Sequence, residues 1–168
     1  MPLVEFAKAN SLKFVASNVP RRYASLVSGK GFEGLDSVSS LGKALLPPLP
    51  IEYDPEVACY KNMMSMGGGG MPAHVTVNLP KAQALKDATM AFFTMKEFVT
   101  GKLILHFNGS YHSENHEGII WYVNKMSPGL DIQVIHTVSQ KDVYLLEKEY
   151  KNRADYILVV DEDMTTTY

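Results

Sequence analysis

Three histidines, two glutamates and a tyrosine lie within the twelve residues His106–Glu117. Imidazole nitrogens bind first-row metal ions, and a tyrosine phenolate can serve as an axial ligand of haem iron. A strand-like run at 102–105 precedes this segment, and a helix-like run at 118–123 follows it. Ligands of open α/β sheets bind outside the carboxyl ends of the strands. The segment is therefore predicted to form one wall of a ligand site.

Tyr111 and His112 are the candidate metal ligands of this segment. His112 and His116 are four residues apart, which would place both on one face if the segment were helical, although the HExxH form is absent. Glu114 and Glu117 could add oxygen ligands or simply favour a helix N-terminus. Tyr111 could equally pack as an aromatic over the edge of the sheet. Gly109 is expected to permit a tight turn or a close approach of a ligand.

A second segment occupies the same position in the predicted architecture, after a strand and at the start of a helix. It contains Asn18, Arg21 and Arg22. Arginine grips carboxylates with two parallel hydrogen bonds, and a helix N-terminus offers further amide donors to an anion. At least one of the two arginines is expected to be an ordinary surface residue. His136, predicted to end a strand, would adjoin the same crevice or be a core histidine.

The elements that must position these residues alternate between helix and strand. Strands are predicted at 12–17, 102–107, 131–137 and 156–160, and helices at 3–10, 21–27, 35–46, 56–66, 116–126 and 140–151, with a long helix that starts at a cap on Asn78. Gln83 and Asp87 are expected on the solvated face of this long helix. The alternation predicts an α/β fold, with a mainly parallel sheet of about four strands flanked by helices.

One α/β domain is expected over 1–168, with a helical, glycine-rich insertion at 51–80. The run Gly67–Gly70, followed by Met71, could form a mobile flap over an apolar ligand. It could also be a flexible loop beside methionine core filler.

Composition narrows the classes of function. The net charge of −2 argues against a nucleic-acid partner, and the single Cys59 excludes an internal disulfide and a cysteine-based metal cluster. Nucleotide-binding glycine motifs and a nucleophile elbow are absent. The chain has no membrane-spanning apolar run and no signal peptide. Its first residues read as the middle of a helix, so a fragment of a longer protein is expected.

Three motifs in order carry a family resemblance: 18–23, 83–91 and Phe107–His112. Together they resemble the ChaN family of iron-regulated, haem-binding lipoproteins, in a superfamily with the Tiki and TraB proteases and the erythromycin esterases. The resemblance covers essentially the whole chain. It implies a homodimer that binds haem at its interface, with a tyrosine on the iron and a histidine near the propionates. Tyr111 is the first choice for that tyrosine, and Tyr60 and Tyr53 are rivals.

The resemblance also implies a lipid-anchored protein of the bacterial cell envelope, in the periplasm or at the outer membrane, whose anchor is not in this chain. Family members carry a further N-terminal motif of the Gly-Glu-x-His type, and Gly109–His112 corresponds to the second such motif. Half of a two-motif metal site would then be missing.

Three functions follow from these observations. The first is haem or iron binding in an uptake system, with Tyr111, His112, His116, Asn18 and the two arginines around the cofactor. The second is a hydrolase that uses a divalent metal ion held by His112, His116 and a glutamate. The third is a non-catalytic interaction domain. A binding protein is expected rather than an enzyme.

Overall fold

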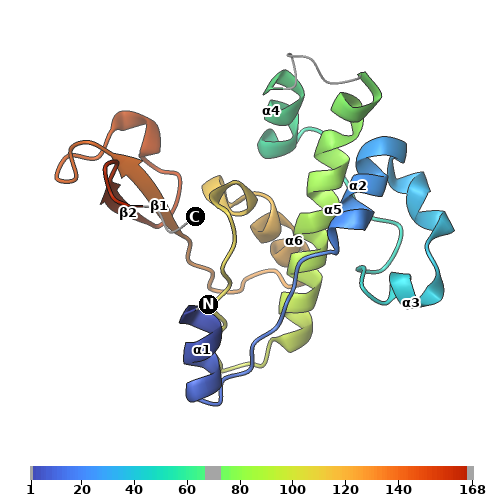
Figure 1. The fold of residues 1–168 in the computed structure, drawn as a ribbon, viewed down its shortest axis with the longest axis horizontal. Coiled ribbons are helices and arrows are strands. Elements are labelled where there is room, and N and C mark those ends of the chain that lie inside the picture. The colour runs from blue at the N-terminus through green and yellow to red at the C-terminus, as the bar shows by residue number, and fades with distance from the viewer. Residues whose placement is uncertain (1, 67–72, 166–168) are drawn as a thin grey trace.

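The computed structural model describes residues 2–66 and 73–165. One long helix, α5 (Ala73–Glu97), runs through the middle of the molecule (Figure 1). Three helices pack against it, namely α2 (Arg21–Lys30), α4 (Ala58–Met66) and α6 (Ile119–Met126). The predicted flap consists of Gly67–Gly70 and Met71, which lie outside the described residues.

Shorter helical elements complete the chain. They are α1 (Pro2–Ala9), α3 (Ser40–Lys43) and the 3-10 helices η1 (Phe32–Ser37), η2 (Ser110–His112), η3 (Glu114–His116) and η4 (Lys148–Tyr150). The helix predicted at 35–46 is therefore two short pieces, and the second begins at a cap in which the Ser39 hydroxyl accepts a hydrogen bond from the Gly42 amide. No helix among the described residues is both long enough and apolar enough to cross a membrane.

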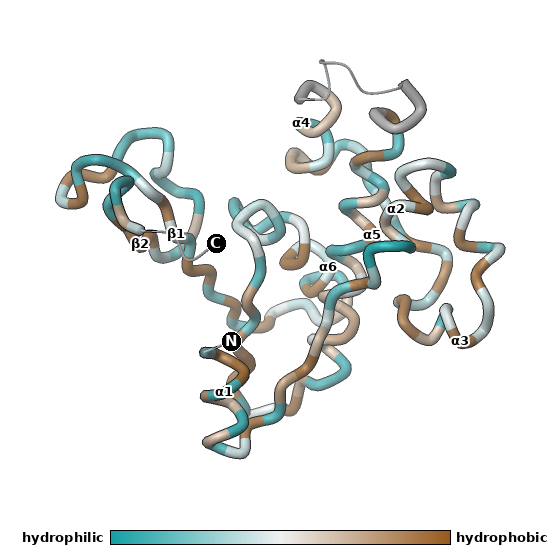
Figure 2. Tube along the Cα trace, viewed as in Figure 1, coloured by the Kyte–Doolittle hydropathy of each residue, from teal (hydrophilic) through white to brown (hydrophobic). Residues whose placement is uncertain are grey.

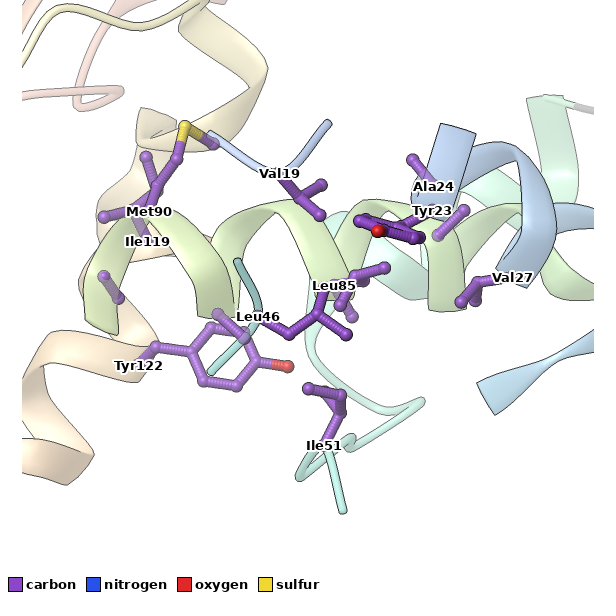
Figure 3. Packing of buried hydrophobic residues seen from close by; sticks show 14 of the residues in the cluster. Val19, Tyr23, Ala24, Val27, Leu46, Ile51, Leu85, Met90, Ile119 and Tyr122 are labelled. Carbon is purple, nitrogen blue, oxygen red and sulfur yellow. The ribbon is translucent and has the colours of Figure 1, made fainter. Parts of the chain in front are cut away.

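The hydrophobic core lies where α2, α5 and α6 meet. Val27 of α2 and Leu85 of α5 are completely buried, and Tyr122 of α6 is 4% exposed. Figure 3 shows Val27 and Leu85 on facing helices, with the Tyr122 ring farther along α5. Burying a side chain of this size stabilises the folded state by about 1.5–3 kcal/mol. The packing of these residues therefore holds α5, which carries part of the site, in position.

The long helix begins earlier than the sequence predicts. Asn78 was expected to cap its N-terminus, but α5 already includes Asn78 and continues through Pro80. A proline in a helix interior removes a hydrogen bond and crowds the preceding turn. Pro80 is nevertheless fully buried, so packing in the core offsets this cost. The domain prediction, including the insertion at 51–80, stays a prediction.

The sheet is smaller than predicted. It has two parallel strands, β1 (Ile135–Gln140) and β2 (Tyr156–Asp161), with Ile135 opposite Tyr156 and Gln140 opposite Asp161. The four-stranded sheet is therefore wrong, while the mixture of helices and a parallel sheet is confirmed. In Figure 1 the sheet lies to one side of the helices.

Two predicted strands, 12–17 and 102–107, are extended but pair in no ladder with another described segment. Their apolar side chains are consequently uncovered: Phe14 is 55% exposed, Leu103 85% and Leu105 71%. Figure 2 shows the hydrophobic stretch between α1 and α2. The two segments meet through the Ser17 hydroxyl, which lies 3.0 Å from Nε2 of His106.

The helix predicted at 140–151 is also wrong, because a loop that contains η4 connects β1 to β2. The side chain of Gln140 organises this loop. Its amide nitrogen donates to the carbonyls of Asp142 and Leu145, and its amide oxygen accepts from the Glu147 amide at 3.2 Å. These bonds compete with the backbone bonds that a helix would need.

Candidate functional site

The segment His106–Glu117 folds as two 3-10 turns, η2 and η3, and α6 begins only at Ile119. Asn115 and His116 have positive φ angles of 57° and 59°, which break any continuous helix here. The condition for His112 and His116 to share one helical face is therefore not met. The two rings have different partners on different parts of the chain.

His112 contacts a carboxylate of the long helix. Its Nδ1 atom lies 2.5 Å from Oδ1 of Asp87, and the histidine side chain is 18% exposed. A histidine that donates its Nδ1 proton to a carboxylate keeps a lone pair on Nε2. The pair therefore presents an oriented imidazole that can bind a metal or accept a proton.

Asp87 itself is completely buried. Burial raises the pKa of this carboxyl group, and hydrogen bonds from His112 and Tyr60 counteract the rise. The Tyr60 hydroxyl donates to Oδ2 of Asp87 at 2.9 Å. Both carboxylate oxygens are thus occupied, which is how a buried polar group avoids the cost of losing water.

The amide of Gln83 lies beside the pair. Its nitrogen is 2.9 Å from Nδ1 of His112, and the residue is 6% exposed. When Nδ1 donates to Asp87 it has no lone pair for this amide, so the Asp87 contact and a hydrogen bond from Gln83 are alternatives. We expected Gln83 and Asp87 on a solvated face, and this expectation is wrong. The sequence did contain a sign of this burial. Residues four apart lie on one face of a helix, and apolar Ala84, Leu85 and Ala88 surround this polar pair.

A glycine at the start of α6 makes the close packing possible. Gly118 has φ +55°, and a Cβ atom there would lie 2.4 Å from the carbonyl oxygen of His112 and 3.3 Å from Oδ2 of Asp87. Gly109, by contrast, has φ −67°, and its nearest neighbour would be Cδ2 of His112 at 4.0 Å. The tight turn predicted at Gly109 is present, because the His112 amide donates to the Gly109 carbonyl at 3.0 Å, but the backbone conformation that requires glycine is at Gly118.

Tyr111 and Glu117 both bind the backbone of Cys59 at the start of α4. The Tyr111 hydroxyl donates to the Cys59 carbonyl at 2.6 Å, and the Glu117 carboxylate accepts from the Cys59 amide at 2.6 Å. A carboxylate at a helix N-terminus is favourable because it meets free amide groups and the positive end of the helix dipole. These two bonds join α4 to the loop that carries His112.

The same surroundings raise two pKa values. Burial, together with the charge of Glu117, raises the pKa of the Cys59 thiol to about 12. Burial, together with the nearby Cys59, Glu114 and Glu117, raises the pKa of the Tyr111 phenol to about 12. Neither group is an anion at neutral pH in this environment, which disfavours Cys59 as a nucleophile.

The rival tyrosines have core roles. Tyr60 is completely buried and bonded to Asp87, and burial raises its pKa strongly. Tyr53 is half-buried, with its ring 5.9 Å from that of Phe32 and 5.7 Å from that of Tyr60. Of the three tyrosines, Tyr111 is the one beside His112 in the chain.

The other end of the segment joins it to the sheet. Nε2 of His116 lies 2.9 Å from the carboxylate of Asp155, and Glu114 lies 3.3 Å from Arg153 and 3.8 Å from Nδ1 of His136. His136 is the second residue of β1 rather than its last, so its predicted place at the strand end is wrong. Its predicted proximity to the segment is confirmed.

Asn18, Arg21 and Arg22 are exposed around the start of α2. The Arg22 guanidinium lies 4.6 Å from the centre of the Tyr23 ring and donates to its hydroxyl at 3.2 Å. Arg22 is thus directed at its own helix, while the preceding Ser17 contacts His106. The structure brings the predicted strand 12–17 to His106 through Ser17, and within the described part of the chain no hydrogen bond or ion pair joins Asn18, Arg21 or Arg22 to the segment His106–Glu117.

A divalent metal ion was a further expectation. Within 2–66 and 73–165, no group of three or more histidine, cysteine, aspartate or glutamate side chains converges as metal ligands would. Haem requires less, because a single side chain can ligate its iron.

Comparison with known families gives one match. Residues 1–123 match the family described as "Haem-binding uptake, Tiki superfamily, ChaN", and this range includes α5 and the whole segment His106–Glu117. No curated protein and no solved structure shows significant similarity to the chain.

Proposed function

The chain belongs to the ChaN family of haem-binding uptake proteins, and we propose that it binds haem through Nε2 of His112. The observation that carries this proposal is the 2.5 Å contact between Nδ1 of His112 and the buried carboxylate of Asp87. Histidines that ligate metals generally donate their other ring proton to such an acceptor, which fixes the tautomer and orients the ring.

The donor chemistry suits an iron porphyrin. With the Nδ1 proton donated to Asp87, the lone pair lies on Nε2 of a side chain that is 18% exposed. Haem iron supplies an axial coordination position that one such nitrogen can occupy. Asp87 increases the basicity of the imidazole, and Tyr60 holds the carboxylate in place through its 2.9 Å hydrogen bond.

Tyr111 remains the alternative iron ligand. To serve, its hydroxyl must leave the Cys59 carbonyl and lose a proton whose pKa is about 12. His112 needs neither change, which favours it as the first ligand. Arg21, which is exposed, is proposed to pair with a haem carboxylate together with Arg22 and Asn18. His116 is proposed to stay with Asp155 unless the ligand displaces it.

Titration with haemin tests the proposal. The wild-type chain should give a stoichiometric Soret band, and His112→Ala should weaken haemin binding by at least tenfold. His116→Ala is the matched control, because His116 lies on the same segment but contacts Asp155. Loss of the Soret band in Tyr111→Phe, with the band retained in His112→Ala, would identify Tyr111 as the iron ligand in place of His112. A flat wild-type titration would reject haem binding altogether.

A hydrolase is the second candidate, and the buried Asp87–His112 pair is the observation that favours it. A histidine oriented by a carboxylate can act as a general base toward water. Ester or peptide turnover that depends on an added divalent metal and is lost in His112→Ala would support this function. Absence of turnover with zinc and with manganese would leave haem binding alone.

We also propose the location and assembly that the family suggests. The protein would act in the bacterial cell envelope, periplasmic or anchored by lipid at the outer membrane, and would form a homodimer. The uncovered apolar side chains of Leu103 and Leu105 support self-association. Fractionation of cells that express the full-length protein tests the location.

A further inference from the structure

An apolar groove lies beside the C-terminal half of α5. It forms between α5, α6 and the proline-rich segment 47–52, and its volume is about 580 Å³. Ala88, Phe92 and Met95 follow one another along a single face of α5 on its floor, and Tyr122 closes one side. Apolar clefts with a few polar groups are the usual form of small-molecule sites.

The groove continues into a second hollow of about 500 Å³. The two hollows share four lining residues, Pro47, Pro48, Phe92 and Lys96, so they adjoin each other, and together they are called the channel. The line of Ala88, Phe92 and Met95 along α5 suits a linear hydrocarbon chain better than a compact solute, because the favourable free energy of apolar burial grows with the area covered.

The charged side chains along the channel indicate the charge of its ligand. Lys125 is neutralised by its ion pair with Glu52, and its ammonium group lies 4.5 Å from the centre of the Trp121 ring. Lys96, at the junction of the two hollows, has no ion pair among the described side chains, and Lys43 lines the second hollow. The Lys96 ammonium lies 5.8 Å from the centre of the Phe93 ring but faces no carboxylate among the described side chains, so it is complementary to the carboxylate of a ligand.

We propose that this channel binds a linear fatty acid, with its acyl chain on Ala88, Phe92 and Met95 and its carboxylate at Lys96. His112 does not line the channel, so fatty-acid binding can be tested independently of haem binding. Lys43 contributes a second positive charge beyond the carboxylate.

The single tryptophan provides a direct readout. Trp121 lies under Lys125 and next to Tyr122, so an acyl chain in the channel changes its surroundings. Saturated fatty acids of eight, ten and twelve carbons are titrated into the full chain below their micelle concentrations. Trp121 emission and heat of binding are followed, with no haemin present.

Affinity should rise about fourfold for each added methylene, which is the expected effect of burying one more such group. Lys96→Gln should weaken binding roughly tenfold, the usual effect of losing a charged hydrogen bond. Lys151→Gln is the control, since Lys151 is exposed in the loop between the strands. The methyl ester of the twelve-carbon acid should bind about as weakly to wild type as the acid binds to Lys96→Gln.

Several results would overturn the proposal. They are the absence of saturable binding, affinity that does not change with chain length, and equal losses in Lys96→Gln and Lys151→Gln. Loss of fatty-acid binding in His112→Ala with full binding in Lys96→Gln would place the acid at the His112 site and also reject the channel.

Discussion

Nδ1 of His112 lies 2.5 Å from Oδ1 of Asp87, and this aspartate is completely buried in the middle of α5. If the pair orients a metal ligand, Asp87→Asn should lower haemin affinity about 10–100-fold, as loss of an outer-shell partner typically does. Spectral titration measures the change. Glu97→Gln, on the same helix, is the control. Equal affinities of Asp87→Asn and wild type would show that Asp87 has no such role.

Gly118 and Gly109 form a matched pair for testing backbone requirements. Gly118→Ala should lower the free energy of unfolding by roughly 1–3 kcal/mol, because alanine is strained at φ +55° and its Cβ would clash with the His112 carbonyl. Gly109→Ala should be neutral or slightly stabilising, since its φ of −67° suits any residue. Urea unfolding gives both values. Equal destabilisation by the two substitutions would contradict the structure.

The Cys59 thiol should react slowly with iodoacetamide at pH 8, because its pKa is about 12 and little thiolate exists. The same reagent should label it rapidly in urea. Glu117→Gln should speed labelling of the folded protein, because the negative charge that raises the pKa is removed. Fast labelling of the native wild-type chain would disagree with the observed environment.

Alkaline pH should destabilise the fold through Tyr111. Its folded pKa of about 12 lies above the ordinary value of 10.0, so the folded state holds the phenolic proton more tightly. The associated stability is fully present below about pH 10 and falls as pH rises toward 12. Unfolding curves at pH 9, 10 and 11 measure this trend, and Tyr111→Phe should make it shallower. A slope identical in both proteins would show that Tyr111 does not contribute.

Self-association should depend on the unpaired segment 102–107. Leu105→Lys should shift the sedimentation profile toward monomer, because Leu105 is 71% exposed and a charge there opposes pairing. Leu41→Lys is the control, at a leucine of α3 that is 85% exposed. Identical profiles for Leu105→Lys and wild type would exclude this segment from the contact.

Local patterns predicted several elements well. The apolar run of β2 and the spacing of α2 and α6 identify those elements within a few residues, because burial on one face leaves a periodic trace. The segments predicted as strands at 12–17 and 102–107 carry the same trace, but neither pairs with a strand within 2–66 and 73–165. Pairing depends on distant segments, and a single run of residues does not contain that information.

The residues of the candidate site also differ in how well the sequence predicts them. His112 stands out from its local setting, whereas Asp87, 25 positions earlier, reads as an ordinary polar residue on a helix. Its role depends on how α5 meets the loop before α6. The sequence indicates the role of Gly118 only weakly. This glycine directly precedes an apolar helical run, and the sequence pattern includes it in the helix.

Helix α5 carries neighbouring residues of two different surfaces, since Asp87 holds His112 and Ala88 lines the channel. A shift of this helix at one surface therefore displaces the other. Equilibrium linkage then sets a strict condition. If both proposed ligands bind, the factor by which a fatty acid changes the affinity for haemin must equal the factor by which haemin changes the affinity for the fatty acid.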